Sequence, residues 1–93
     1  MRARHHFHID YLGHSVSATV QTGHTPVVEV LVDGKETGHA TSRDDRPVTL
    51  VIELPTDPPR PVTVRATPGP GVPRCMLLAE GDEEPHVMAP RLY

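Results

Sequence analysis

Cysteine is nearly absent from this chain of 93 residues, in which Cys75 is the only one. A single cysteine excludes an internal disulfide, so packing alone must hold the domain together. This is usual for proteins that fold in a reducing compartment. We therefore expect a cytoplasmic protein.

Aromatic residues are also scarce, since the chain has no tryptophan, two tyrosines and one phenylalanine. Phe7 and Tyr11 are needed for a core, which leaves Tyr93 near the end of the chain. Exposed aromatic platforms for sugars are therefore excluded. Stacking on single-stranded nucleic acid is excluded for the same reason.

Positive charge is in deficit, with nine lysines and arginines against twelve acidic residues and a net charge of −3. A chain of this composition has no broad cationic field with which to hold a polyanion. We expect no nucleic-acid partner.

Long apolar runs are missing as well. No segment approaches the roughly 20 apolar residues of a membrane span. The start of the chain is basic, but no apolar run of the length of an export signal follows it. The sequence therefore predicts neither a membrane protein nor an exported one.

What the sequence does contain is alternation of apolar and polar residues with a period of two, interrupted by eleven prolines and seven glycines. Prolines at this density leave few uninterrupted runs for helices, whereas period-two burial is typical of strands with one face in a core. Asp33-Gly34 is a strong tight-turn signal, and the polar run with Gly38 is typical of an edge strand. The predicted strands are 5–11, 15–21, 27–32, 36–41, 47–54, 62–67 and 74–79.

Seven short strands separated by glycine and proline turns are the signature of a small antiparallel β-sandwich with an immunoglobulin-like or fibronectin-like layout. A partly open barrel is the alternative. The proline-rich segment 55–61 is predicted to be a stiff connection outside any central ladder. We expect one sandwich domain over residues 1–79, followed by an acidic, proline-containing tail over 80–93.

No catalytic motif is present. The serines do not lie in a Gly-x-Ser-x-Gly elbow, and the glycines near residue 70 alternate with prolines and open no helix that would cradle a phosphate. A thin core leaves little room for a concave catalytic pocket. We therefore expect a protein that is not an enzyme.

One group of residues suits a metal ion. His6, His8 and Asp10 alternate along the first strand, so they share a face at a spacing of about 6.6 Å. Two imidazoles and a carboxylate suit zinc, nickel or copper, with His39 or His24 as a further ligand supplied by the fold. The alternative interpretation is a polar row that faces solvent.

Cys75 and Met76, together with His86 and Met88, form a second group whose soft ligands would suit cuprous copper. Their spacing matches no known motif. The alternative interpretation is that Cys75 points inward from its strand and packs as a small apolar side chain.

Apolar residues are in excess on the strand faces that are expected to be exposed to solvent. When the alternate residues of each strand point inward, five apolar side chains are left pointing outward: Val27, Leu31, Val51, Met76 and Leu78. Contiguous exposed apolar patches mark contact sites. We therefore predict a protein-protein interaction or accessory module that binds a protein partner or self-associates as a homodimer. The alternative is that the tail covers these positions through Val87, Met88 and Leu92.

Overall fold

The structure is a computed structural model, and it describes residues 3–43 and 46–91. Within these residues the chain forms nine strands in two antiparallel sheets and no helix. Consequently, no long apolar helix that could cross a membrane is found in the described part of the chain.

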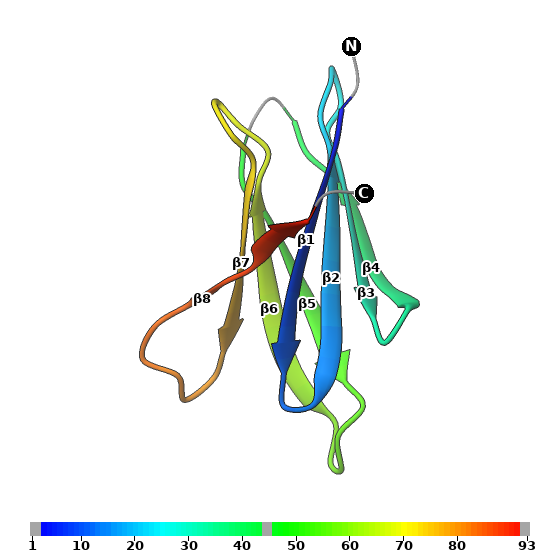
Figure 1. The fold of residues 1–93 in the computed structure, drawn as a ribbon, viewed down its shortest axis with the longest axis vertical. Coiled ribbons are helices and arrows are strands. Elements are labelled where there is room, and N and C mark those ends of the chain that lie inside the picture. Colours follow the sequence, from blue (N-terminus) through cyan, green and yellow to red (C-terminus); the bar gives the residue numbers. More distant parts are fainter. Residues whose placement is uncertain (1–2, 44–45, 92–93) are drawn as a thin grey trace.

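The two sheets pack face to face as a sandwich (Figure 1). The first sheet has the order β4-β3-β2-β1-β9 and the second has the order β5-β6-β7-β8. The first sheet contains β1 (Arg4–Tyr11), β2 (His14–Gln21), β3 (Val27–Val32), β4 (Lys35–Thr41) and β9 (Ala89–Arg91). The second contains β5 (Val48–Leu54), β6 (Arg60–Thr67), β7 (Arg74–Ala79) and β8 (His86–Val87).

The predicted antiparallel β-sandwich is confirmed, and its seven predicted strands agree with β1 to β7 within two residues at each end. Each sheet is filled largely in chain order, β1 to β4 in the first and β5 to β8 in the second. Immunoglobulin domains instead interleave their strands between sheets through Greek-key connections. The likeness to immunoglobulin domains is thus one of layers and not of connectivity.

Two tight turns fix the register of the first sheet. Asp33 and Gly34 both have positive φ, 52° and 83°, as the turn predicted from Asp-Gly requires. Leu12 and Gly13 form the corresponding turn between β1 and β2, with φ values of 52° and 79°. Because both hairpins close through two residues, alternate residues of β1, β2 and β3 share one face.

The core is made by the inward-facing residues of both sheets. On β2 and β3 every second residue is fully buried, and β6 and β7 repeat this pattern from the other layer. The buried apolar residues are Phe7, Val16, Ala18, Val20, Val28, Val30, Val32, Ile52, Leu54, Val62, Val64, Ala66, Cys75, Leu77, Ala79 and Met88. The inward orientation predicted for Cys75 is confirmed.

β4 is an edge strand, as its polar sequence predicts. It carries a bulge opposite Val30 and Leu31. A Cβ atom at Gly38 would lie 3.3 Å from Cγ2 of Ile52, which shows how closely β4 approaches the second sheet. The bulge and the lack of a side chain let the two layers close on this side.

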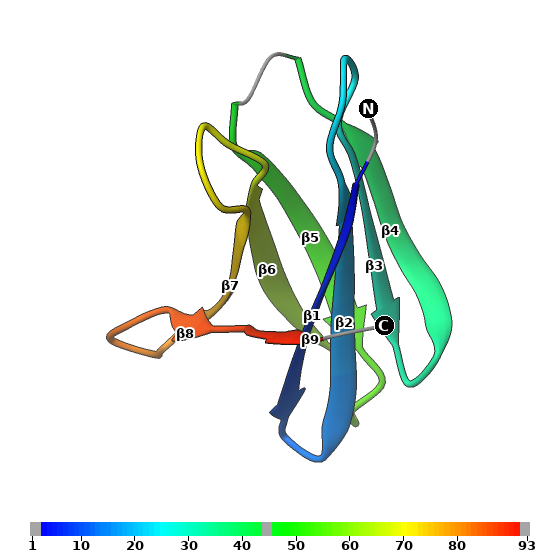
Figure 2. The ribbon, with the colours of Figure 1, turned by 45° about the horizontal axis from the view of Figure 1, so that its top comes forward.

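The opposite side is closed by the C-terminal segment. β8 pairs with β7 in the second sheet, and β9 pairs with β1 in the first. Between them Met88 is buried in the core, and its backbone N–H donates to the carbonyl oxygen of Cys75 at 3.1 Å. Figure 2 shows the segment crossing from one layer to the other.

This crossing corrects the domain boundary predicted at residue 79. Residues 86–91 belong to the sandwich because they extend both of its sheets. A second correction concerns the proline-rich segment, whose last two residues, Arg60 and Pro61, open β6 opposite Leu54 and Glu53. Pro61 is tolerated there because it lies beyond Ala79, the last residue of β7 that pairs with β6.

Candidate interaction surface

The five apolar residues predicted to form one contact surface lie on two opposite faces of the molecule. Val27 and Leu31 project from β3 on the outer face of the first sheet, whereas Val51, Met76 and Leu78 project from β5 and β7 on the outer face of the second. The set is therefore corrected to two separate groups. Sequence periodicity gives the side of a strand but not the sheet to which the strand belongs.

Polar neighbours surround the first group. In the ladder, Leu31 lies between Ser17 and Glu36, and Val27 lies between Gln21 and Thr41. Both apolar side chains are only partly exposed. This face resembles the ordinary wet face of an antiparallel sheet.

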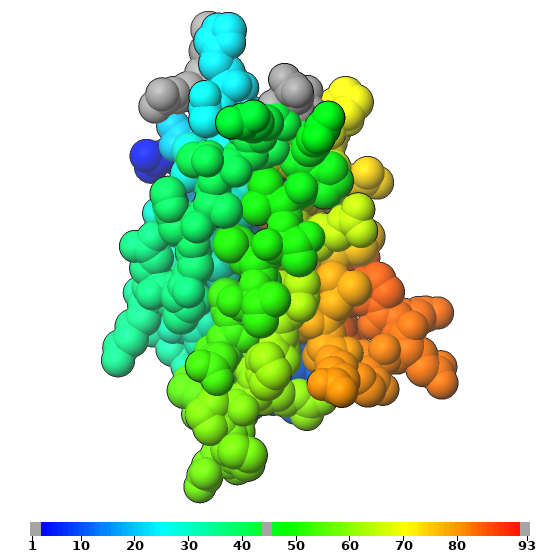
Figure 3. All heavy atoms as spheres, turned by 180° about the vertical axis from the view of Figure 1, so that it is seen from behind, coloured from blue at the N-terminus to red at the C-terminus, as the bar shows by residue number. Residues whose placement is uncertain are grey.

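The second group lies in two adjacent cross-strand rows of the second sheet. Val51 and Leu78 flank Thr63 in one cross-strand row. In the next row, Met76 lies beside Val87 of β8. The exposed fractions are 69% for Val51, 70% for Val87 and 37% for Leu78. We call these four residues, Val51, Met76, Leu78 and Val87, the apolar strip; they lie on the face of the molecule seen in Figure 3.

Charged residues occupy the two ends of the same face. Arg74 is opposite Thr67 at one end, and its diagonal neighbour Arg65 lies one row further in, opposite Met76. Glu53 lies at the other end beside Pro61, where β7 leads into the acidic loop 80–84. Within the described residues, the side chains of Arg65, Arg74 and Glu53 make no hydrogen bond or ion pair.

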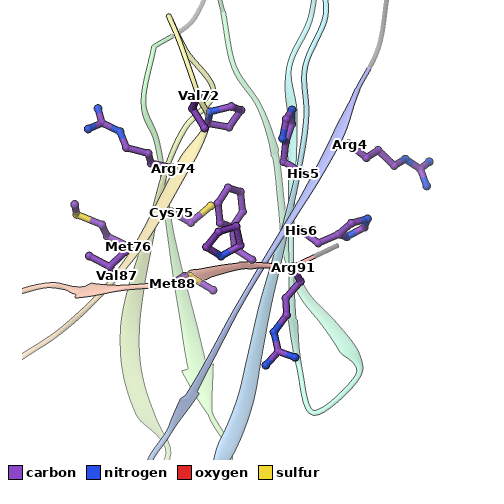
Figure 4. Close-up of a pocket in the computed structure, with 13 residues that line it drawn as sticks. Arg4, His5, His6, Val72, Arg74, Cys75, Met76, Val87, Met88 and Arg91 are labelled. Carbon is purple, nitrogen blue, oxygen red and sulfur yellow. The ribbon is translucent and has the colours of Figure 1, made fainter. Parts of the chain in front are cut away.

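A cavity of about 620 Å³ opens beside the strip, between β1 and β7. Phe7, Cys75 and Met88 line it from the core, and Val72 stands at its edge (Figure 4). Arg4 and Arg74 also belong to its lining, but Figure 4 shows their side chains diverging to either side of it. The cavity is therefore mainly apolar, with its cationic groups directed outward.

The cavity is lined by the buried thiol of Cys75. Burial raises the pKa of the Cys75 thiol to about 12, so the thiolate that a nucleophile or a metal ligand requires is disfavoured at neutral pH. Ser15 and Ser42 make hydrogen bonds elsewhere in the fold, Ser15 to His8 and Ser42 to the carbonyl oxygen of Arg46.

The predicted metal ligands lie on one face of β1 but do not converge. Nδ1 of His6 lies 3.2 Å from Oγ1 of Thr19. Nε2 of His8 lies 2.9 Å from Oγ of Ser15 and 3.4 Å from Oδ1 of Asp10. Across residues 3–43 and 46–91, no three His, Cys, Asp or Glu side chains are grouped closely enough to hold a metal ion.

Both ring nitrogens of His8 contact other side chains of the protein. Nη2 of Arg91 lies 2.9 Å from Nδ1 of His8, and because arginine can only donate, Nδ1 is the acceptor and Nε2 carries the proton. His39, a suggested further ligand, is separated from His6 by Thr19 and Glu29 in the ladder. His8 therefore serves in this structure to hold β9 against β1.

The soft-ligand group is also divided by the fold. Cys75 and Met88 are buried, whereas Met76 belongs to the apolar strip and His86 bonds to Asp82 at 2.8 Å. As far as residue 91, the tail does not cover the strip in the way that the alternative supposed. Met88 enters the core, Val87 extends the strip, and Leu92 lies outside the described residues.

Comparison of the chain with protein-family models, with curated proteins and with solved structures gives no match.

Sequence reasoning missed Val87, Arg65 and Arg74 as parts of this surface. Val87 lies in a two-residue strand within a proline-containing segment, which is too short to show periodicity. The two arginines alternate with apolar residues as outward positions do, but only the pairing of β6 with β7 makes them neighbours.

Proposed function

We propose that this protein is a non-enzymatic interaction module that binds protein through the outer face of its second sheet. One observation carries the proposal: Val51, Leu78 and Val87 are exposed, and with Met76 they lie in two adjacent cross-strand rows. Single exposed apolar residues are common, whereas a contiguous apolar group on a sheet face marks a contact surface.

The physical reason is the cost of leaving this group in water. Covering apolar surface contributes roughly 25 cal/mol per Å². A flat sheet face also offers a partner a rigid surface that loses little conformational entropy on binding. Charged residues border the apolar strip, with Arg65 beside Met76, Arg74 at one end and Glu53 at the other, as in the usual arrangement of an apolar interface centre and a polar rim.

Other features agree with a binding role. The cavity between β1 and β7 holds a protonated thiol and apolar side chains, and its arginines point outward. We place the module in the cytoplasm, because its single cysteine is a buried free thiol.

Site-specific photocrosslinking tests the proposal. A photoreactive amino acid in place of Val51 is expected to give a discrete crosslinked protein product in cells that express the chain. The matched control is the same substitution at Leu12, which is also an exposed apolar residue (52%) but lies in the β1–β2 turn. Equal labelling from both positions, or none from position 51, would contradict the proposal.

A further inference from the structure

The outer face of the second sheet carries opposite charges at its two ends. Arg74 lies at one end, where β7 begins, and Arg65 lies one row further in, beside Met76. Glu53 lies at the other end, where β7 leads into Glu80 and the rest of the acidic loop. The apolar strip occupies the middle.

The acidic end keeps its character despite two nearby basic groups. Arg60 donates through Nη2 to the backbone carbonyl oxygen of Glu80 at 3.1 Å, so it leaves the Glu80 carboxylate uncovered. His86 is engaged with Asp82. Among the residues that the structure describes, the carboxylates of Glu53 and Glu80 have no hydrogen bond or ion pair.

We infer that the partner of this face is a second copy of the same chain, packed face to face with its strands reversed. This inference rests on the proposed function. The two copies are related by a two-fold axis that lies between them, perpendicular to the strands and midway between the row of Met76 and the row of Leu78. Rotation about this axis makes the face complementary to itself. Such an interface is isologous, the commonest kind in homodimers.

The charges match twice in this arrangement. Reversing the strands about this axis keeps β7 over β7, so Arg74 of each copy lies over Glu80 of the other. Met76 of each copy then faces Leu78 of the other, so the centres of the two apolar strips cover each other. With the strands of both copies in the same direction, arginine would meet arginine and carboxylate would meet carboxylate.

The two kinds of contact have different roles. Burial of the apolar strip supplies the affinity, because charges at a wet rim contribute little to it. The charges select the orientation, since placing like charges opposite each other is unfavourable. Dimerisation should therefore survive moderate salt but weaken as salt screens the rim.

Charge reversal with mixing tests this inference. The first variant is R74E and the second is E80R. Each alone is expected to weaken dimerisation by at least about tenfold, because like charges then meet at both ends. An equal mixture of the two is expected to regain association. The control E36R makes the same change in net charge as the second variant, but on the outer face of the first sheet, and should dimerise as the wild type does.

Sedimentation equilibrium measures each sample, and its outcomes separate this inference from the proposed function. If the wild type is a monomer and its position 51 crosslinks to a different protein, the partner is not a second copy. The inference then fails, and the proposed interaction face stands. A dimer that the charge reversals leave unchanged overturns the reversed-strand arrangement. A dimer that also tolerates Val51→Glu places the contact elsewhere and contradicts both.

Discussion

The hydroxyl of Tyr11 donates a 2.8 Å hydrogen bond to Oδ2 of Asp82, which joins the end of β1 to the loop after β7. Nε2 of His86 lies 2.8 Å from the same oxygen, and its ring lies 5.3 Å from that of Tyr11. These contacts tie Asp82 within the loop 80–85 to β1 and to the residue that follows the loop. They thereby set the path on which Val87 reaches the apolar strip.

Tyr11→Phe should loosen this loop without disturbing the core. The variant keeps the ring beside His86 and removes only the hydroxyl, so one donor to Asp82 is lost. We expect faster amide hydrogen exchange over residues 80–88 and unchanged exchange in β2 and β3. Exchange over 80–88 at the wild-type rate would show that the hydrogen bond does not hold the loop.

Asp33 should make stability depend on acid pH. Hydrogen bonds from His14 and from the backbone N–H of Ser15 lower the pKa of the Asp33 carboxyl below its ordinary value of 3.8. A lowered folded-state pKa gives stability that is present above the unfolded-state pKa and is lost as pH falls through the folded-state pKa.

Asp33→Asn isolates this effect, because asparagine also tolerates the positive φ of 52° at this turn. Urea unfolding at about pH 7 and about pH 3 should show a smaller loss of stability in the variant than in the wild type. Asp82, whose pKa is lowered by hydrogen bonds from His86 and Tyr11, remains in both proteins and supplies a common background. Identical acid dependence in the two would contradict the role of Asp33.

Met88 should contribute far more to stability than its neighbour Val87. Met88 is buried between the two sheets, whereas Val87 is 70% exposed. Met88→Ala should lower the free energy of unfolding by about 2–5 kcal/mol, and Val87→Ala should change it by no more than about 0.5 kcal/mol. Chemical denaturation measures both. Similar values for the pair would mean that the C-terminal segment does not close the sandwich.

Cys75 should be unreactive in the folded protein. Burial raises the pKa of its thiol to about 12, so both access and thiolate are lacking near neutral pH. Iodoacetamide at about pH 8 should label Cys75 only after unfolding, with a rate that rises through the denaturation transition. Rapid labelling of the native protein would show instead that the cavity between β1 and β7 admits solvent to the sulfur.

Most of the sandwich is predictable from local patterns. Alternation locates β1 to β7, and Asp33-Gly34 specifies its turn, because burial and turn conformation depend on neighbouring residues. The crossing at Met88 is not predictable in this way. Two strands of two and three residues have no measurable period, and their pairing with β7 and β1 depends on contacts distant in sequence.

For the same reason, the sequence predicts only part of the contact surface. Periodicity places Val51, Met76 and Leu78 outward, and it places Val27 and Leu31 outward equally well. Only the assignment of β3 to the first sheet separates the two groups. The diagonal pair Arg65 and Arg74 likewise depends on the register between β6 and β7, which sequence alone does not provide.

The molar mass of the protein in solution tests the central claim most directly. Light scattering during gel filtration at micromolar concentration should give twice the chain mass of 10.2 kDa for the wild type and for Leu12→Glu. Val51→Glu, which places a carboxylate in the apolar strip, should give the mass of a single chain. A wild-type protein that remains a single chain at every concentration, or a Val51→Glu variant that still dimerises, would contradict the account.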